Sequence, residues 1–210
     1  IKIEYAKAAE LPWKDTQKLP YTLTGAYLSP LFERAFIQGL HQPNLRPSAD
    51  EWEHALVKTV DLIQPCSNAA CEQKWYVFSN STKPVCPFCD TPFVGLLPVL
   101  NLYSSQQEGR FLPDNQRLMI YNNQSLYQWH SNRLVFPNER LSPEQKKRVG
   151  YFVFHQQQWY LVNEALPDLM NVDTKQNIAI GEKIALADGQ KLLLARGEGG
   201  RLVVVQMVSC

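Results

Sequence analysis

Four of the five cysteines lie within one short segment of the 210-residue chain, and their spacing is the clearest chemical signal in the sequence. They form a C-x4-C pair and a C-x2-C pair, separated by a stretch long enough for a β-hairpin. Two tight turns that each present two thiolates to a common point match the tetrahedral coordination of a zinc ion. The predicted ligands are Cys66, Cys71, Cys86 and Cys89.

Four thiolates complete the coordination of Zn²⁺ and leave no position for a water molecule, so the site is predicted to be structural. Such an ion contributes roughly 10 to 16 kcal/mol of apparent binding energy in modules too small for a core. The alternative is two disulfides, which would require an oxidising compartment. The start of the sequence has no secretory signal pattern, so we expect a cytoplasmic protein with one zinc ion and a free thiol at Cys210.

A short hairpin is needed to bring the two cysteine pairs together. Between them, "KWYVF" at 74–78 has the composition of a strand and "NSTKP" at 80–84 that of a turn. We therefore predict a zinc β-ribbon over residues 65–95. It has more aromatic surface than so small a core could bury, and exposed aromatic side chains commonly anchor protein partners. The predicted partner-binding residues are Trp75, Tyr76, Phe78 and Phe88.

Residues 1–64 are predicted to form a short helical region. One helix has Ser29 as its N-cap and ends at Gly39, and a second follows Ser48, which with Glu51 has the spacing of a capping box. The histidines of this region have no ligand or nucleophile at a useful spacing, so we expect both at the surface. Apolar residues recur on one face of the second helix, and the predicted buried stripe is Trp52, Ala55, Leu56, Val60 and Ile63.

Residues 96–210 are predicted to form an antiparallel β-sandwich. Short apolar runs, among them "SLYQWH" at 125–130 and "NRLVFP" at 132–137, are predicted to be strands and recur between separators rich in Gly, Asn, Asp and Gln. Helical periodicity is confined to 141–147. The fold class is therefore α+β, with a helical segment at 1–64, a zinc ribbon at 65–95 and an all-β domain at 96–210. The aromatic residues predicted to fill the sandwich core are Trp129, Tyr151, Phe152, Phe154, Trp159 and Tyr160. The alternative is that these aromatic side chains line a groove for a ligand.

The composition narrows the classes of function. A formal charge of +1 lacks the basic excess of a nucleic-acid binder, and no run approaches the roughly 18 to 20 apolar residues of a membrane helix. The sequence shows no paired carboxylates and no Ser/His/Asp or Cys/His arrangement of the kind that would indicate an enzyme. A nucleic-acid-binding zinc ribbon stays open as an alternative, because such ribbons often serve there and "CEQKWYVFSNSTK" supplies lysines beside aromatics.

The stretch "LSPLFERAFIQGLHQPNLRPSADEWEHAL" resembles the last two helices of the C-terminal lobe of a eukaryotic-like Ser/Thr protein kinase. In that family the arginine corresponding to Arg46 pairs with the glutamate of an Ala-Pro-Glu segment, which this sequence lacks. The Gly-rich loop, the His-Arg-Asp loop and the Asp-Phe-Gly metal site are also missing. The resemblance implies the tail of a larger kinase that is catalytically silent as given.

The C-terminal part is similar to a forkhead-associated domain, through "QWYLVN" and "IAIGEKIALADGQKLLLA". Domains of this family read phosphothreonine through charge-assisted hydrogen bonds. The Ser-Arg-x-x-His motif is absent, and "PEQKKRVG" stands in its place. The residues that could substitute as phosphate ligands are Arg133, Lys146, Lys147 and Arg148, and the alternative is that they form a solvated basic face.

The order of these parts resembles one group of bacterial kinases of tellurium-resistance and stress-response systems. Those kinases are associated with a von Willebrand factor A-type protein, TerY-like, and with a metal-dependent Ser/Thr phosphatase. The resemblance implies a non-catalytic scaffold in which the ribbon joins the catalytic lobe to the sandwich and the tail docks these proteins. A phosphothreonine-peptide reader and the nucleic-acid-binding ribbon are the alternative functions.

Overall fold

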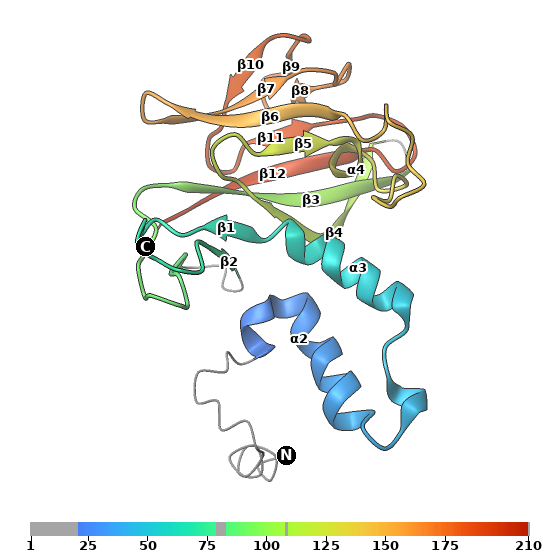
Figure 1. The fold of residues 1–210 in the computed structure, drawn as a ribbon. Coiled ribbons are helices and arrows are strands. Elements are labelled where there is room, and N and C mark those ends of the chain that lie inside the picture. The colour runs from blue at the N-terminus through green and yellow to red at the C-terminus, as the bar shows by residue number, and fades with distance from the viewer. Residues whose placement is uncertain (1–20, 79–82, 108, 210) are drawn as a thin grey trace. The chain divides into compact units, whose positions relative to one another are not determined.

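A computed structural model describes residues 21–78, 83–107 and 109–209, and these form two compact units that meet in the sequence between Val60 and Asp61. Cys210 and most of the turn predicted at 80–84 lie outside the described residues. The fold is α+β, with helices in the first unit and antiparallel sheets in the second (Figure 1). The longest helix of the described part has 12 residues, too few for the roughly 20 that a bilayer requires.

The first unit is a pair of helices with short turns around them. The 3₁₀ turn η1 (Tyr21–Thr24) runs directly into α2 (Gly25–Glu33), which continues as the π-helical η2 (Arg34–Gln38). The prediction that Ser29 caps this helix is wrong, because the preceding turn already starts the helix and the Ser29 hydroxyl donates back to the Tyr21 carbonyl at 3.2 Å.

The end of this helix at Gly39 is confirmed. The Gly39 N–H donates to the Arg34 carbonyl at 2.7 Å, and a Cβ at this position would lie only 2.7 Å from that same oxygen. A residue with a side chain would therefore force this turn open. The guanidinium of Arg46 completes the connection, because it donates to the Gly39 carbonyl at 2.8 Å and to the Leu40 carbonyl at 3.1 Å.

After η3 (Pro43–Leu45), α3 (Ala49–Val60) begins with the predicted capping box. The Ser48 N–H donates to Glu51 Oε2 at 2.8 Å, and the Glu51 N–H donates to Ser48 Oγ at 3.2 Å. The predicted buried stripe is wrong in part, since Leu56 is 51% and Val60 60% exposed. Ala55 is buried as predicted, Trp52 and Ile63 are half-buried, and Thr59 is a further buried residue of this helix.

The second unit contains two antiparallel sheets and a two-stranded ribbon. The four-stranded sheet has the order β10-β7-β6-β5, and the six-stranded sheet has the order β4-β3-β12-β11-β8-β9 (Figure 1). The two ribbon strands are β1 (Ile63–Pro65) and β2 (Trp75–Val77). The others are β3 (Leu97–Gln107), β4 (Arg110–Met119), β5 (Ser125–Tyr127), β6 (Arg148–His155), β7 (Gln158–Asn163), β8 (Met170–Asn171), β9 (Gln176–Asn177), β10 (Lys183–Ala185), β11 (Lys191–Leu193) and β12 (Arg201–Val208).

Both large sheets contribute to one hydrophobic core, which is the arrangement of a β-sandwich. Alternation along the strands decides which side chains enter it: in β7, Trp159, Leu161 and Asn163 are buried and their neighbours are not. Aliphatic residues dominate this core. The predicted aromatic core is therefore only partly confirmed, because Phe152 and Trp159 are buried, Phe154 is 41% exposed near the end of β6, and the rest are half-buried.

Two segments predicted as strand or helix have other structures. Residues 128–131, predicted to continue the strand at 125–130, form the short helix α4 (Gln128–Ser131), with Tyr127 and His130 in a capping box. The predicted strand at 132–137 is limited to one bridge between Asn132 and Gly200, and residues 141–147 form turns.

The ribbon belongs to the second unit and packs with its sheets. The amide of Gln64 donates to the Ile120 carbonyl at 3.2 Å, and the Met119 N–H donates to the Asp61 carbonyl at 2.8 Å. The rings of Trp75 and Tyr121 meet edge to face, with centroids 5.2 Å apart. These contacts fix the ribbon, and with it the cysteines, beside the sandwich.

Candidate metal centre

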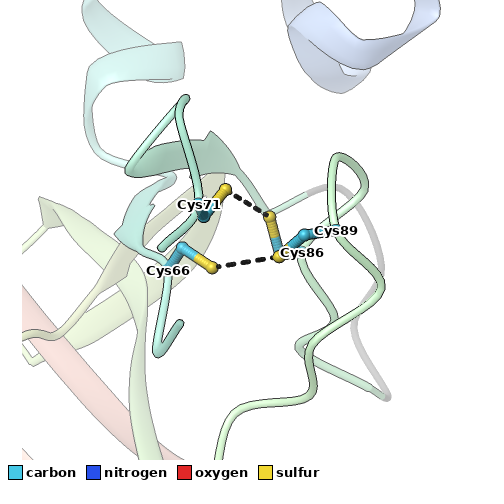
Figure 2. A group of neighbouring side chains, drawn as sticks. All are labelled: Cys66, Cys71, Cys86 and Cys89. Atoms are coloured by element: carbon cyan, nitrogen blue, oxygen red, sulfur yellow. Dashed lines mark hydrogen bonds between the residues drawn. The ribbon is translucent and has the colours of Figure 1, made fainter. Parts of the chain in front are cut away.

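The four predicted ligands come together, with all their sulfur atoms within 4.8 Å of one another. Cys66 directly follows β1 and Cys71 closes the turn after it, while Cys86 and Cys89 belong to a second tight turn. Figure 2 shows the four side chains converging from these two segments. The spacing of the two pairs in the sequence therefore corresponds to a real cluster that could hold a metal ion.

The distances between the sulfurs suit a tetrahedral ion. Cys66 Sγ lies 3.5 Å from Cys89 Sγ, and Cys71 Sγ lies 3.9 Å from Cys86 Sγ (Figure 2). A metal–sulfur bond of about 2.3 Å implies sulfur–sulfur edges of about 3.8 Å in a regular tetrahedron. A disulfide would need about 2.05 Å, and none of the four described cysteines forms one.

The backbone of each turn holds its pair of thiols. The Cys66 N–H donates to the Lys74 carbonyl at 2.7 Å, and the Cys86 N–H donates to the Thr91 carbonyl at 2.9 Å. Lys74 and Asp90 have φ values of 56° and 53°, so each turn closes through a residue in the left-handed region. The Asn68 N–H points at Cys66 Sγ from 3.4 Å, which is a contact that stabilises a thiolate ligand.

The thiols differ in their protonation when no ion is bound. Burial raises the pKa of Cys66 to about 12 and also raises the pKa of Cys86. The pKa of Cys89 is instead lowered to about 6, because the Thr91 hydroxyl lies 3.3 Å from its sulfur and stabilises the thiolate. A divalent cation would remove the cost of gathering four thiolates, two of which are buried.

The predicted partner-binding aromatics do not form one exposed surface. Tyr76 is only 5% and Phe78 only 2% exposed, so both belong to the interior and their prediction as exposed anchors is wrong. The prediction treated the ribbon as a free-standing module, whereas its strands pack within the second unit. Trp75 is 47% exposed and Phe88 is half-buried, so these two remain accessible.

Three of the four predicted phosphate ligands have partners within the chain. Arg148 forms an ion pair with Glu164 at 2.7 Å and covers the Tyr151 ring, and Lys147 pairs with Glu144 at 2.8 Å. The Lys146 ammonium donates to the Glu139 carbonyl at 3.0 Å. The side chain of Arg133 is exposed. These contacts are those of a solvated basic face, and the phosphate role stays a prediction.

A buried polar network near the ribbon gave no signal in the sequence. Arg201 donates to Asp114 Oδ2 at 2.8 Å and to Gln116 Oε1 at 3.0 Å, and Gln116 donates to Asp61 Oδ2 at 2.6 Å. His130 Nε2 lies 3.1 Å from Asp61 Oδ1. Its members come from β4, α4, β12 and the start of the second unit, so only the fold brings them together.

The histidine of this network has both ring nitrogens engaged. His130 Nδ1 accepts the Tyr127 N–H at 3.0 Å, so the ring proton lies on Nε2 and is donated to Asp61. No nitrogen is left to accept a proton from a substrate. The network therefore holds β12 against the start of the ribbon and offers no general base in this arrangement.

Comparisons of the chain with protein-family models, with curated proteins and with solved structures give no match.

Proposed function

We propose that this chain is a non-catalytic, zinc-stabilised interaction module, the tail of a Ser/Thr protein kinase, which docks other proteins of a phosphorylation system. The observation that carries the proposal is the cluster of four thiols with tetrahedral spacing, placed by a ribbon that packs beside a β-sandwich. Soft thiolates in a tetrahedral set favour Zn²⁺. Four of them leave no coordination site for a substrate, so the ion has a structural role.

Two further observations support the kinase and scaffold parts of the proposal. The helix pair of the first unit exposes large apolar side chains, including Phe36 at 63% and Val60 at 60%, as expected of helices that pack against further protein. The antiparallel sandwich is compatible with the forkhead-associated resemblance of the sequence. On this proposal the partner is a von Willebrand A-type protein, acting with a Ser/Thr phosphatase in the cytoplasm.

A binding measurement with purified proteins tests this function. The zinc-loaded chain is titrated with a von Willebrand A-type protein from the same organism, by calorimetry, and Cys86→Ser serves as the metal-free comparison. We expect saturable binding that Cys86→Ser weakens strongly, and no phosphotransfer from ATP. Absence of binding, together with a steep salt-dependent affinity for single-stranded DNA or RNA, would replace the proposal with the nucleic-acid-binding alternative.

A further inference from the structure

A groove of about 1070 Å³ lies between the ribbon and the sandwich, within the second unit. One wall is the chain that leaves β1, at 65–67, and another is the segment 93–96, which leads from the second cysteine pair into β3. The β6–β7 hairpin and the segment 186–188 close the opposite side. The groove therefore exists only while the ribbon is held beside the sheets.

Large apolar side chains along this groove are exposed to solvent. Val94 is 84%, Leu96 57% and Phe154 41% exposed, and all three line the groove. Trp75, exposed at the surface of the ribbon, lies against Tyr121, which is another lining residue. Contiguous exposed apolar surface of this kind usually marks a place where another molecule binds.

The walls of the groove are fixed by hydrogen bonds. The indole N–H of Trp159 donates to the Leu96 carbonyl at 2.8 Å, which joins the hairpin to the segment from the ribbon. The amide of Gln158 donates to the Leu186 carbonyl at 2.8 Å and joins the hairpin to the wall beside it. A groove that is formed before binding loses less conformational entropy when an occupant enters.

The charge of the lining selects the occupant. Asp188 is the one ionisable carboxylate among the described lining residues, and no lysine, arginine or histidine is found there. Cys66 also lines the groove, and four thiolates around a divalent ion carry a net charge of two minus. The lining is thus apolar with negative charge, and it complements an apolar segment that carries a positive side chain.

The size and backbone of the groove favour a peptide over a small molecule. Its volume lies slightly above the roughly 300 to 1,000 Å³ of small-molecule pockets. Within the described residues, the N–H groups of Val94 and Gly95, on the exposed segment that lines the groove, make no backbone–backbone hydrogen bond, so a bound peptide can accept hydrogen bonds from them. We propose that this groove binds a peptide segment of a partner protein, with apolar side chains beside a lysine or arginine.

This inference rests on the proposed function as an interaction module, and peptide selection tests it without knowledge of the partner. The zinc-loaded chain is used to select from a phage-displayed library of random peptides, and the enriched peptides are synthesised. We expect them to share apolar residues and a lysine or arginine, to lack acidic residues and to compete for one site. Failure to enrich peptides, or enrichment of acidic ones, would overturn the inference.

Surface variants then locate the site. Val94→Ser and Phe154→Ser each change an exposed side chain, so the fold should persist, and we expect about tenfold weaker peptide binding. Ile180→Ser is the matched control, because Ile180 is 59% exposed and is not among the lining residues. Equal affinity of the groove variants and the control would contradict the proposed site.

A charge variant tests the selectivity. Asp188→Asn keeps the oxygen that accepts the Met207 N–H at 2.8 Å but removes the charge. This substitution should weaken the binding of a selected peptide several-fold and leave the binding of the lysine-to-glutamine version of that peptide unchanged. Equal effects on both peptides would refute the charge argument.

The same variants separate the groove from the proposed function. If the von Willebrand A-type protein binds all groove variants normally while the selected peptides do not, the proposed function stands and the groove is not its docking site. If the peptides bind the groove but the von Willebrand A-type protein does not bind the chain, the groove stands as a peptide-binding site and the proposed function fails.

Discussion

Cys66, Cys71 and Cys86 are each held by a local backbone hydrogen bond, and this is why the clustering of the four cysteines could be predicted from spacing alone. The turns that place Cys66 and Cys86 close within a few residues, through the Lys74 and Thr91 carbonyls. Turns that close within a few residues can be predicted from the spacing of cysteines in a sequence. The exposure of an aromatic residue depends on what lies across the fold, so the exposure predicted for Tyr76 and Phe78 was wrong, while the predicted gathering of the four cysteines is confirmed.

Alanine substitutions of Phe78 and Trp75 should differ in their cost to stability, because Phe78 is a core residue and Trp75 a surface residue. Phe78→Ala removes a ring that is 2% exposed and should cost about 3 to 5 kcal/mol of unfolding free energy. Trp75→Ala removes a half-exposed ring and should cost less than about 2 kcal/mol. Urea unfolding of the zinc-loaded chain measures both, and equal costs would show that the assigned burial is incorrect.

The buried network gives a second prediction for single residues. Arg201→Met leaves the buried Asp114 carboxylate without its ion-pair partner, and should destabilise the chain by about 3 to 5 kcal/mol. Arg140→Met is the control, because that side chain is 89% exposed, and its change should be within about 0.5 kcal/mol. Chemical denaturation of both variants decides the point, and a small effect at Arg201 would contradict the role of the network.

At the scale of the elements, periodicity predicted the type of most segments but not all their limits. The alternation in β7 and the capping box at Ser48 are local patterns, and both are found as expected. The buried face of α3 depends on which residues of α2 pack against it, so Leu56 was misplaced. Residues 128–131 form a helix instead of a strand, with His130 in its capping box and joined to Asp61 from a distant part of the chain.

The ion pair between the two helices of the first unit should be visible in an acid titration. Hydrogen bonds from Arg34 lower the pKa of Glu51 to about 2, from a usual value of 4.5. Because the folded-state pKa is lowered, the stabilisation is complete above pH 4.5 and is lost as the pH falls through about 2. NMR of the Glu51 carboxyl carbon measures this titration. Arg34→Gln should return the midpoint toward 4.5, and an unchanged midpoint would show that the pair does not form in solution.

At the scale of the whole molecule, the ribbon and the sandwich were predicted as separate domains at 65–95 and 96–210, a division that stays a prediction. The structure groups both in the unit that begins at Asp61. The contacts responsible join residues distant in the sequence, such as Gln64 with Ile120 and Trp75 with Tyr121. Such long-range pairing leaves no local pattern, so the sequence could not place a groove between the ribbon and the sandwich.

The shared packing predicts that the second unit unfolds as one. Calorimetry of a fragment spanning 61–210 should show a single transition whose midpoint rises when zinc is added. The reason is that the ribbon residues Tyr76 and Phe78, and Leu62 directly before β1, are buried within this unit. Two separate transitions, with only the smaller one sensitive to zinc, would instead support independent ribbon and sandwich domains.

The central claim is that the four clustered cysteines bind one structural zinc ion, and native mass spectrometry combined with elemental analysis of the full chain tests it most directly. We predict one zinc per chain in the reduced protein, loss of the ion in Cys71→Ser, and full retention in Cys210→Ser, which changes the one cysteine outside the cluster. A chain that contains two disulfides and no metal, or a Cys71→Ser variant that keeps its zinc, would contradict the account.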